Sequence, residues 1–366
     1  MKKVGVLTSF FATNFGAALQ CYALKKVLEE MGYDVEYIPY KQPGLYRLFY
    51  PVQARNILAR NPVSVYHNLL SFIQKYRKWR NFERFRTKYI TDKQLCTTIP
   101  EDKDYYILGS DQIWNPHITK GFDDVFWGKF KRKEDSTIFS YAASTENMQY
   151  LDHEKQYIKN AINSLDYVSV REDQFNLDLS TICGRNDIVT VLDPTLLLDM
   201  SKYENIGLRR PMNDKYVLFY RIRQCNHFIP CINEYAKSIG ARLLILSSGI
   251  VKELKLTADK DDNIIYEPLV GVEYFLSAVK YAEHIFTPSF HGTAFSIIFK
   301  KAFNTLVLDD NWNTRTNDLL SKAGLMDRKI YAGEKINNTH PDYDIVFNNL
   351  EYYQNHSMAF LQKALS

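Results

Sequence analysis

The stretch HIFTPSFHGTAFSIIF, residues 284–299, indicates how this chain folds. It begins as a short apolar strand, passes through the loop TPSFHGT and continues as the apolar helix AFSIIF. A strand that leads directly into a helix is the repeating unit of parallel α/β sheets. In such sheets ligands bind beyond the carboxyl ends of the strands, where loops meet helix N-termini. The loop is therefore a candidate binding site.

The same alternation of strand and helix runs through both halves of the chain. KKVGVLTS, YYILGS and STIFSYAAS predict strands in the first half, and KYVLFYRI, ARLLILSS and FNTLVLD predict strands in the second. The pattern indicates two parallel-sheet α/β domains, residues 1–210 and 211–345, joined near RRPMNDK (209–215). A last helix at 346–366 is expected to cross back to the first domain.

Length and composition agree with this division. A chain of 366 residues is too long for one ordinary hydrophobic core. The five cysteines are scattered without a CxxC pair, so they predict reduced thiols and neither a disulfide framework nor a zinc site. Polar residues interrupt the N-terminal apolar run too early for a signal peptide, and no stretch approaches the about 18 apolar residues of a membrane span. We expect a cytoplasmic protein.

The positive charge is concentrated in residues 45–90, which hold ten basic residues and one acid, Glu83. Aromatic residues are interleaved, and the spacing predicts a basic helical insertion over 45–95. Such a segment suits the anionic inner face of the cell membrane or a phosphorylated partner. A solvated basic helix is the alternative, and no nucleic acid is expected because no RNA-binding motif accompanies the charge. The basic residues are Arg47, Arg55, Arg60, Lys75, Arg77, Lys78, Arg80, Arg84, Arg86 and Lys88.

The loop SFHGT, residues 289–293, has the composition of an anion site. A helix N-terminus presents free N–H groups and a partial positive charge. Ser289 and Thr293 add hydroxyl groups, and Gly292 lets the backbone approach a ligand closely. His291 is the one side chain of the loop that exchanges a proton near neutral pH. The alternative is that His291 only caps the helix.

Two loops of the first half suit a sugar. In GSDQIWNP, residues 109–116, the loop combines a carboxylate, amides and an indole ring, which together can hydrogen-bond and stack on a sugar. Its Asp111 is also a candidate base for a hydroxyl group, and a loop-stabilising carboxylate is the alternative. The second loop, TNFG (residues 13–16), precedes a helix with a small first turn, a setting for a close anion or sugar contact at Gly16; a turn glycine with an Asn cap is the alternative. The predicted acceptor-side residues of the two loops are Asn14, Phe15, Gly16, Gln112, Trp114 and Asn115.

Arginines next to strand ends complete the candidate site. Arg171 in SVRE, and Arg221 and Arg223 in FYRIR, are natural forks for phosphate or carboxylate, although such arginines also bridge domains. Asp193, which precedes a proline in VLDPTLLL, reads as a turn residue. The sequence lacks a P-loop, an HExxH motif, metal-ligand spacing and a GxSxG elbow, so hydride transfer, metal hydrolysis and serine acyl chemistry have little support.

Seven motifs together resemble the polysaccharide pyruvyl transferase family. They are TNFGAALQCYAL, GSDQIWNP, SYAAS, SVREDQ, VLDPTLLL, SFHGTAFSIIF and TRTNDLLSKAGL, and the resemblance covers roughly residues 1–330. It implies two Rossmann-like domains of the glycosyltransferase-B kind that face each other across a cleft. It also implies ketal transfer from phosphoenolpyruvate to a sugar, with galactose the family's suggestion, on a surface or capsular polysaccharide precursor linked to polyprenyl diphosphate.

The resemblance assigns roles by position. His291 corresponds to the family's donor-site histidine and is expected to act as general acid, with Asp111 as base. Better-known branches carry an arginine two residues before this histidine, where this chain has Ser289. Phosphate binding is therefore assigned to Arg221 or Arg223 and the helix N-terminus. No cofactor or metal is expected, since the donor reacts without cleavage of a bond to phosphorus.

Two other functions remain open. A nucleotide-sugar-dependent glycosyltransferase would have the same two-domain fold, because fold does not fix function. A glycan-binding or membrane-binding protein that has lost catalysis is the third hypothesis.

Overall fold

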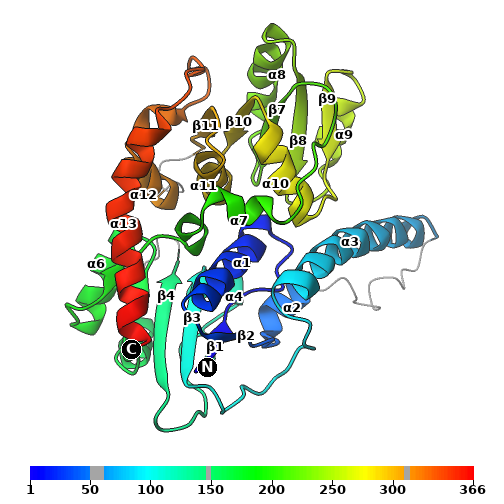
Figure 1. Cartoon of the computed structure of the whole chain (residues 1–366). Coiled ribbons are helices and arrows are strands. Elements are labelled where there is room, and N and C mark those ends of the chain that lie inside the picture. Colours follow the sequence, from blue (N-terminus) through cyan, green and yellow to red (C-terminus); the bar gives the residue numbers. More distant parts are fainter. Residues whose placement is uncertain (50–61, 146–149, 309–313) are drawn as a thin grey trace.

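The computed structural model describes residues 1–49, 62–145, 150–308 and 314–366. Within them the chain forms two six-stranded sheets, one in each lobe (Figure 1). The strand orders are β2-β1-β3-β4-β5-β6 and β12-β11-β10-β7-β8-β9, and all pairs are parallel. The predicted fold class, two Rossmann-like α/β domains with a helical insertion in the first, is confirmed.

The first sheet is built from the N-terminal half of the chain. Its strands are β1 (Lys3–Leu7), β2 (Asp34–Tyr37), β3 (Tyr105–Asp111), β4 (Thr137–Ala143), β5 (Ser169–Val170) and β6 (Val189–Thr190). The helices of this half are α1 (Phe15–Glu30), α2 (Pro43–Phe49), α3 (Pro62–Tyr89), α4 (Pro116–Thr119), α5 (Asp152–Ile162), α6 (Asp173–Cys183), the 3-10 turn η2 (Pro194–Leu197) and α7 (Met200–Glu204). Arg55 and Arg60 of the predicted basic segment lie outside the described residues.

The second sheet follows the same plan. Its strands are β7 (Tyr216–Arg221), β8 (Arg242–Ser247), β9 (Ile264–Glu267), β10 (His284–Thr287), β11 (Phe303–Leu306) and β12 (Lys329–Ile330). Its helical elements are η3 (Asn226–Phe228), α8 (Ile229–Ser238), α9 (Lys252–Ala258), α10 (Val272–Tyr281), α11 (Phe290–Ile298), α12 (Thr314–Ala323) and η5 (Met326–Arg328), and α13 (Tyr343–Ala364) ends the chain.

Helix α1 lies at the seam between the lobes. Its first ten residues, 15–24, are all buried, because the helix contacts its own sheet on one side and α10 and α11 of the second lobe on the other. Phe15 stacks on Phe82 of α3 at 5.2 Å and on Phe275 of α10 at 4.6 Å between ring centroids. Stacked aromatic pairs add stability beyond the area that they bury. One ring thus joins the first lobe, its insertion and the second lobe.

The last helix, α13, extends along both lobes (Figure 1). Near its start the Tyr343 hydroxyl donates to the carbonyl of Ser296 in α11, at 3.3 Å. Just beyond its end the Leu365 carbonyl accepts hydrogen bonds from the hydroxyls of Tyr33 and Tyr105, at 2.7 and 2.8 Å. The helix is therefore anchored to the second lobe at one end and to the first lobe at the other. None of the helices in the described ranges is long and apolar enough to cross a bilayer.

Gly16 offers a test of how closely the lobes meet. A Cβ atom built on Gly16 would lie 2.0 Å from Nδ1 of His291, on the facing lobe. Gly16→Ala is therefore expected to lower the free energy of unfolding by about 1–3 kcal/mol, measured by urea denaturation. Gly249→Ala, where the new Cβ meets no atom within 4 Å, is the control.

The three atoms nearest to this Cβ all belong to the His291 ring, so removing that ring should relieve the overlap. In a His291→Ala background, Gly16→Ala is expected to cost much less than in the wild type. An equal cost in both backgrounds would show that the lobes do not meet as described.

Candidate active site

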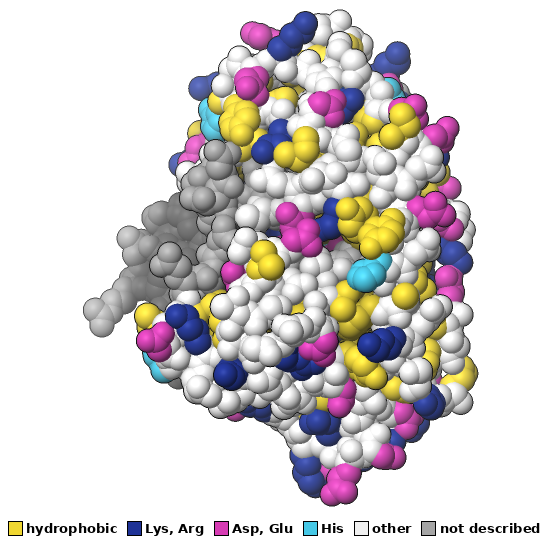
Figure 2. Space-filling view, turned by 90° about the vertical axis from the view of Figure 1, so that its left-hand side faces the viewer, with side chains coloured by type: hydrophobic (Ala, Val, Ile, Leu, Met, Phe, Trp, Pro, Cys, Tyr) yellow, Lys and Arg dark blue, Asp and Glu magenta, His cyan; other side chains and the backbone are white. Residues whose placement is uncertain are grey.

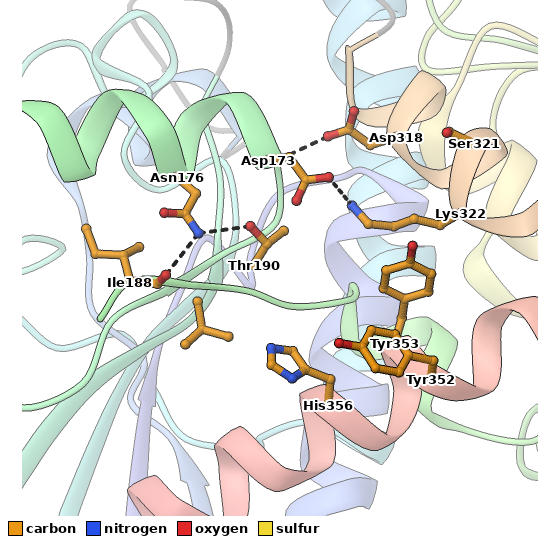
Figure 3. Close-up of a pocket in the computed structure, with 11 residues that line it drawn as sticks. Asp173, Asn176, Ile188, Thr190, Asp318, Ser321, Lys322, Tyr352, Tyr353 and His356 are labelled. Atoms are coloured by element: carbon orange, nitrogen blue, oxygen red, sulfur yellow. Dashed lines mark hydrogen bonds and ion pairs between the residues drawn. The ribbon is translucent and has the colours of Figure 1, made fainter. Parts of the chain in front are cut away.

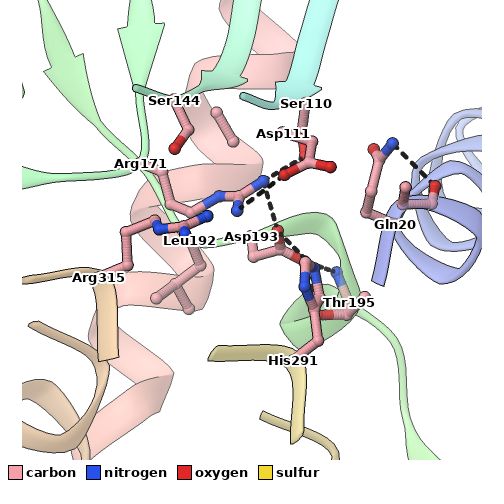
Figure 4. Close-up of polar contacts among 12 residues, drawn as sticks. Gln20, Ser110, Asp111, Ser144, Arg171, Leu192, Asp193, Thr195, His291 and Arg315 are labelled. Atoms are coloured by element: carbon pink, nitrogen blue, oxygen red, sulfur yellow. Dashed lines mark hydrogen bonds and ion pairs between the residues drawn. The ribbon is translucent and has the colours of Figure 1, made fainter. Parts of the chain in front are cut away.

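Polar side chains from four strand ends meet at the seam between the lobes (Figure 4). Asp111 ends β3, Arg171 follows β5, Asp193 follows β6, and His291 lies in the first turn of α11 after β10. Parallel strands bring their carboxyl ends to one edge of a sheet, and here the edges of two sheets face each other. The sequence had predicted three of these four residues as site residues.

Asp193 connects the two lobes. Its carboxylate lies 2.8 Å from Nη2 of Arg171 and 3.6 Å from Nε2 of His291. It also caps η2 by accepting hydrogen bonds from the backbone N–H and hydroxyl of Thr195, at 2.9 and 2.6 Å. Burial opposes its ionisation, but Arg171, and after it His291 and Thr195, hold the pKa of Asp193 below its ordinary value. Asp193 is thus a buried, ionised carboxylate.

Arg171 is buried beside this carboxylate. Its Nη2 donates to the hydroxyl of Ser110 at 2.9 Å, and Nη1 lies 3.7 Å from Oδ1 of Asp111. The guanidinium also lies over the ring of Phe290, 5.1 Å from its centroid. Residues of both lobes therefore surround this arginine. Its planar guanidinium can pair with carboxylates and stack on an aromatic ring at the same time.

Glu172 is a second buried carboxyl group at the seam. Its Oε1 accepts a hydrogen bond from the Ser144 hydroxyl and lies 3.9 Å from Nε of Arg315 in α12. Burial raises the pKa of Glu172 to about 7, against the opposing effects of Arg171, Arg315 and Ser144. The group therefore changes its protonation state near neutral pH.

Several buried atoms of this cluster have no hydrogen-bond partner. They are Nε and Nη1 of Arg171 and Oε2 of Glu172. Oδ2 of Asp193 and Nε2 of His291 also lack a hydrogen bond and are held only by the ion pairs described above. Folded proteins rarely bury polar atoms without partners, and each such atom calls for an explanation. Their concentration at one place indicates groups that a bound ligand would pair.

The centre of the cluster is closed in this structure. The cavity lined by Arg171, Asp193, Phe290 and Arg315 has a volume of only about 10 Å³, which is barely enough for one water molecule. The space between these four side chains is therefore too small for a substrate in this structure. Among the described residues, no three His, Cys, Asp or Glu side chains are grouped so as to hold a metal ion.

Three residues predicted to bind the donor serve the second lobe itself. The Ser289 hydroxyl accepts the Gly292 N–H at 3.3 Å, and the Thr293 hydroxyl pairs with that of Thr305 at 3.0 Å. A Cβ on Gly292 would lie 2.4 Å from Oγ1 of Thr287, so close packing explains this glycine. The polar groups of Ser289, Gly292 and Thr293 are thus engaged within the lobe in this structure, and their role in donor binding stays a prediction.

Arg221 also lies apart from His291. Its Nε donates to Oδ1 of Asn226 at 2.8 Å. Val217 and Phe219 precede it on one face of β7 and pack with α8, so the alternation of a strand directs Arg221 to that same face. Helix α11 packs on the other face, and Arg223 lies farther along the loop after β7. The arginine that the structure places next to His291 is Arg171.

Two residues of GSDQIWNP belong to the core of the first lobe. The Trp114 ring is fully buried and stacks on Trp127 at 5.0 Å, and its Nε1 donates to the carbonyl of Phe126 at 2.8 Å. It has no free face for a sugar, which corrects that prediction. Asn115 is buried as the N-cap of α4. Gln112 is partly exposed, its Nε2 has no hydrogen-bond partner, and its acceptor role stays a prediction.

The TNFG loop also has structural roles. The Asn14 side chain caps α1 by accepting the Ala17 N–H at 3.2 Å, and Phe15 is buried in the interlobe aromatic stack. The close approach predicted at Gly16 is real, but it is made by the His291 ring. Phe15 and Gly16 are therefore corrected from acceptor contacts to contacts between the lobes.

Asp193, Glu172 and Arg315 were not predicted as site residues. Asp193 does cap a turn as the sequence indicated, but it also pairs with Arg171. All three lie in motifs that carried the family resemblance: VLDPTLLL, SVREDQ and TRTNDLLSKAGL. A charged residue between two apolar runs, as in IVTVLDPTLLL, was the signal that could have identified Asp193.

Comparison with solved structures supports the fold. The S. aureus MnaA–UDP co-structure aligns with a TM-score of 0.52 at 14% identity, over 98% of this chain and 91% of that one. A Listeria monocytogenes protein assigned as a UDP-N-acetylglucosamine 2-epimerase gives 0.52 at 10% identity, over 99% and 90%. AviGT4, a glycosyltransferase of avilamycin A biosynthesis, gives 0.50 at 10% identity, over 100% and 97%. At such identities the likeness concerns the fold alone.

The sequence comparison identifies the family. No curated protein matches the chain. The pattern that defines the polysaccharide pyruvyl transferases matches residues 14–310, a span that includes Asp111, Arg171, Asp193 and His291. With a match over most of its length, and with those side chains gathered at one seam, the chain belongs to the polysaccharide pyruvyl transferase family.

Proposed function

We propose that this protein transfers the pyruvyl group of phosphoenolpyruvate to a hexose of galactose type, in a surface polysaccharide or its lipid-linked precursor, and releases phosphate. The observation that carries the proposal is the contact of His291 with Asp193 and, through it, with Arg171. A proton donor and a buried guanidinium, held together between two lobes, suit an anionic donor that must be protonated on carbon. The family to which the chain belongs supports the same reaction.

His291 acts as the general acid in this proposal. Its imidazolium protonates the methylene carbon of the donor, and an acceptor hydroxyl adds to the neighbouring carbon. The carbon–oxygen bond to phosphate then breaks, and a second hydroxyl of the same sugar closes the ketal. One hydroxyl proton passes by way of the base, Asp111, to restore the imidazolium, and the other leaves with phosphate. Asp193, which contacts the ring and not the reacting atoms, is a positioning residue.

Arg171 and Arg315 hold the anionic groups of the donor. Nε and Nη1 of Arg171 are buried donors without hydrogen-bond partners, and Arg315 lies beside the same small cavity. Guanidinium groups pair with phosphate and carboxylate through parallel hydrogen bonds and stabilise charge as the phosphate leaves. No resident cofactor is required, because no bond to phosphorus breaks.

Asp111 remains the proposed base for the acceptor hydroxyl. Its side chain retains 18% exposure at the edge of the cluster, 3.7 Å from Arg171, where an acceptor can approach. Glu172 is buried deeper and is bonded to Ser144. The partly exposed carboxylate is therefore the better placed of the two.

A nucleotide-sugar-dependent glycosyltransferase is the second candidate. Its support is the fold shared with AviGT4 and with a protein that was solved with UDP. A carbohydrate assay separates the two functions. Phosphate release from phosphoenolpyruvate, with a gain of one pyruvate less one water in the acceptor mass, marks pyruvyl transfer, whereas consumption of UDP-sugar without these changes marks the alternative.

His291→Ala is expected to lower kcat for pyruvyl transfer by about 10²–10⁴-fold, because the carbon atom loses its proton donor. Phosphate release from phosphoenolpyruvate measures the rate, and circular dichroism checks the fold. His117→Ala, which changes an exposed histidine of α4, should leave kcat unchanged. A His291→Ala enzyme with wild-type kcat would remove the acid role.

Because the pKa of Glu172 is raised in the folded protein, we expect the stability of the protein to depend on pH. Its folded-state pKa of about 7 is above the unfolded value of 4.5, so the folded protein holds an extra proton between these pH values. Stability should therefore fall as pH rises from about 5 to 8, by up to about 3 kcal/mol from this group. Urea denaturation across this range should show a flatter profile for Glu172→Gln. Parallel profiles for the two proteins would contradict the raised pKa.

We expect helix α3 to contact anionic membranes, as an acceptor linked to a lipid would require. Leu69, Ile73 and Tyr76 are 44, 37 and 41% exposed, and Arg77 and Arg80 are exposed on the same side of the helix. We expect the protein to sediment with phosphatidylglycerol vesicles and not with phosphatidylcholine vesicles, and to be released by salt.

The double variant Arg77→Glu/Arg80→Glu should abolish this sedimentation. Lys252→Glu/Lys255→Glu makes the same change of charge on the exposed side of α9 and should bind like the wild type. Equal loss in both variants would indicate a general effect of net charge, and no loss in either would place the contact elsewhere.

A further inference from the structure

A groove of about 520 Å³ opens beside the closed centre, at the same seam between the lobes (Figure 3). Four elements form it: α6 and β6 of the first lobe, α12 of the second, and α13. Its lining residues are Asp173, Asn176, Ile188, Val189, Thr190, Asp318, Ser321, Lys322, Tyr352, Tyr353 and His356. The volume is in the range of about 300–1,000 Å³ that is typical of small-molecule sites.

The groove adjoins the candidate active site. Asp318 and Lys322 line both the groove and the small cavity that holds Arg171 and Asp193. Asp173 follows directly after Glu172, and its backbone N–H donates to Oδ2 of Asp318 at 3.2 Å across the seam. A ligand that lies in the groove therefore borders the residues that close the centre.

Aromatic rings are exposed along one wall of the groove. The Tyr352 side chain on α13 is 70% exposed, and its ring lies nearly parallel to the His356 imidazole, with 6.2 Å between centroids and 12° between planes. Tyr353 meets Tyr352 edge to face at 5.3 Å. Figure 2 shows this side of the molecule, where hydrophobic side chains lie beside acidic and basic ones. Exposed rings of this kind are suited to stack on the apolar face of a sugar.

The opposite wall carries carboxylates. Asp173 and Asp318 are both at the groove, and its lysine, Lys322, is already paired with Asp173 at 2.7 Å. Carboxylates accept hydrogen bonds from hydroxyl groups but repel phosphate and carboxylate ligands. Rings on one wall and hydrogen-bond acceptors on the other therefore favour a neutral ligand that is rich in hydroxyl groups.

We propose that this groove binds the sugar units of the acceptor glycan that flank the unit being modified. Its use by an acceptor rests on the proposed function, whereas its affinity for neutral oligosaccharide does not. The groove then gives the enzyme its preference for a chain over a single sugar, and the reacting unit lies beyond Asp318 and Lys322, toward Arg171 and His291.

The test compares galactose with a galactose tetrasaccharide as probes. Saturation-transfer NMR without donor should detect the tetrasaccharide on the wild type, and Tyr352→Ala should weaken its binding about tenfold by removing the stacking ring. His356→Ala should weaken it in the same direction. Tyr331→Ala, which changes a tyrosine of 42% exposure at the end of β12, is the matched control and should bind like the wild type.

The steady-state kinetics of pyruvyl transfer provide an independent test of the groove. With phosphoenolpyruvate, Tyr352→Ala should raise KM for the tetrasaccharide about tenfold and leave kcat, KM for the donor and KM for galactose unchanged. If Tyr352→Ala binds and uses the tetrasaccharide like the wild type, or if the wild type binds neither probe, the groove is not a glycan site. If the tetrasaccharide binds through Tyr352 but no phosphate is released, the groove stands and the proposed reaction fails.

Discussion

The ion pair between Asp193 and Arg171, with His291 at 3.6 Å from the same carboxylate, is the contact on which the candidate site depends. Either charge alone would be costly to bury, and removal of one partner from a buried pair leaves the other uncompensated. Two partners come from the first lobe and the third comes from the second. The protonatable ring is therefore in place only when the lobes are together, so the fold couples closure to the assembly of the site.

The contact between the two lobes depends in turn on the packing around α1. Phe15 packs against α3 and α10, and the absence of a side chain at Gly16 lets the helix meet His291. The same tight contact leaves almost no free volume around Arg171, and Nε and Nη1 of Arg171 and Oε2 of Glu172 have no hydrogen-bond partner. In the reaction that we propose, a closed arrangement of this kind would exclude water from the proton transfer to carbon.

The fold was predictable from the sequence because local patterns determine it. The apolar runs KKVGVLTS and HIFTPS predict strands, and the segments GAALQCYAL and FHGTAFSII, which follow them, have the apolar spacing of helices. These patterns do not depend on distant residues. His291, Arg171 and Asp111 were predictable as polar groups at strand ends. Which side of a strand an arginine faces is not local: Arg221 and Arg171 look alike in sequence, but β7 directs the first toward α8.

The errors in the predicted site share a physical cause. The indole ring of Trp114 is of a kind on which a sugar can stack, but only its packing against Trp127 shows that the ring lies inside the core. Asp193 reads as a turn because it is one, and its second role depends on Arg171, which is 22 positions away in the chain. Residues with two roles are visible only once distant segments are brought together.

Helix α13 has a consequence for how the lobes can move. It is held by Ser296 at one end and by Tyr33 and Tyr105 at the other, so it resists stretching on its own side of the molecule. On the other side of the seam, the Lys78 and Asn81 side chains of α3 donate to the carbonyls of Ser248 and Leu269 in the second lobe. The lobes are therefore tied together at two separate elements, α13 and α3 (Figure 1). A movement that opens the seam beside α3 has to break these two hydrogen bonds.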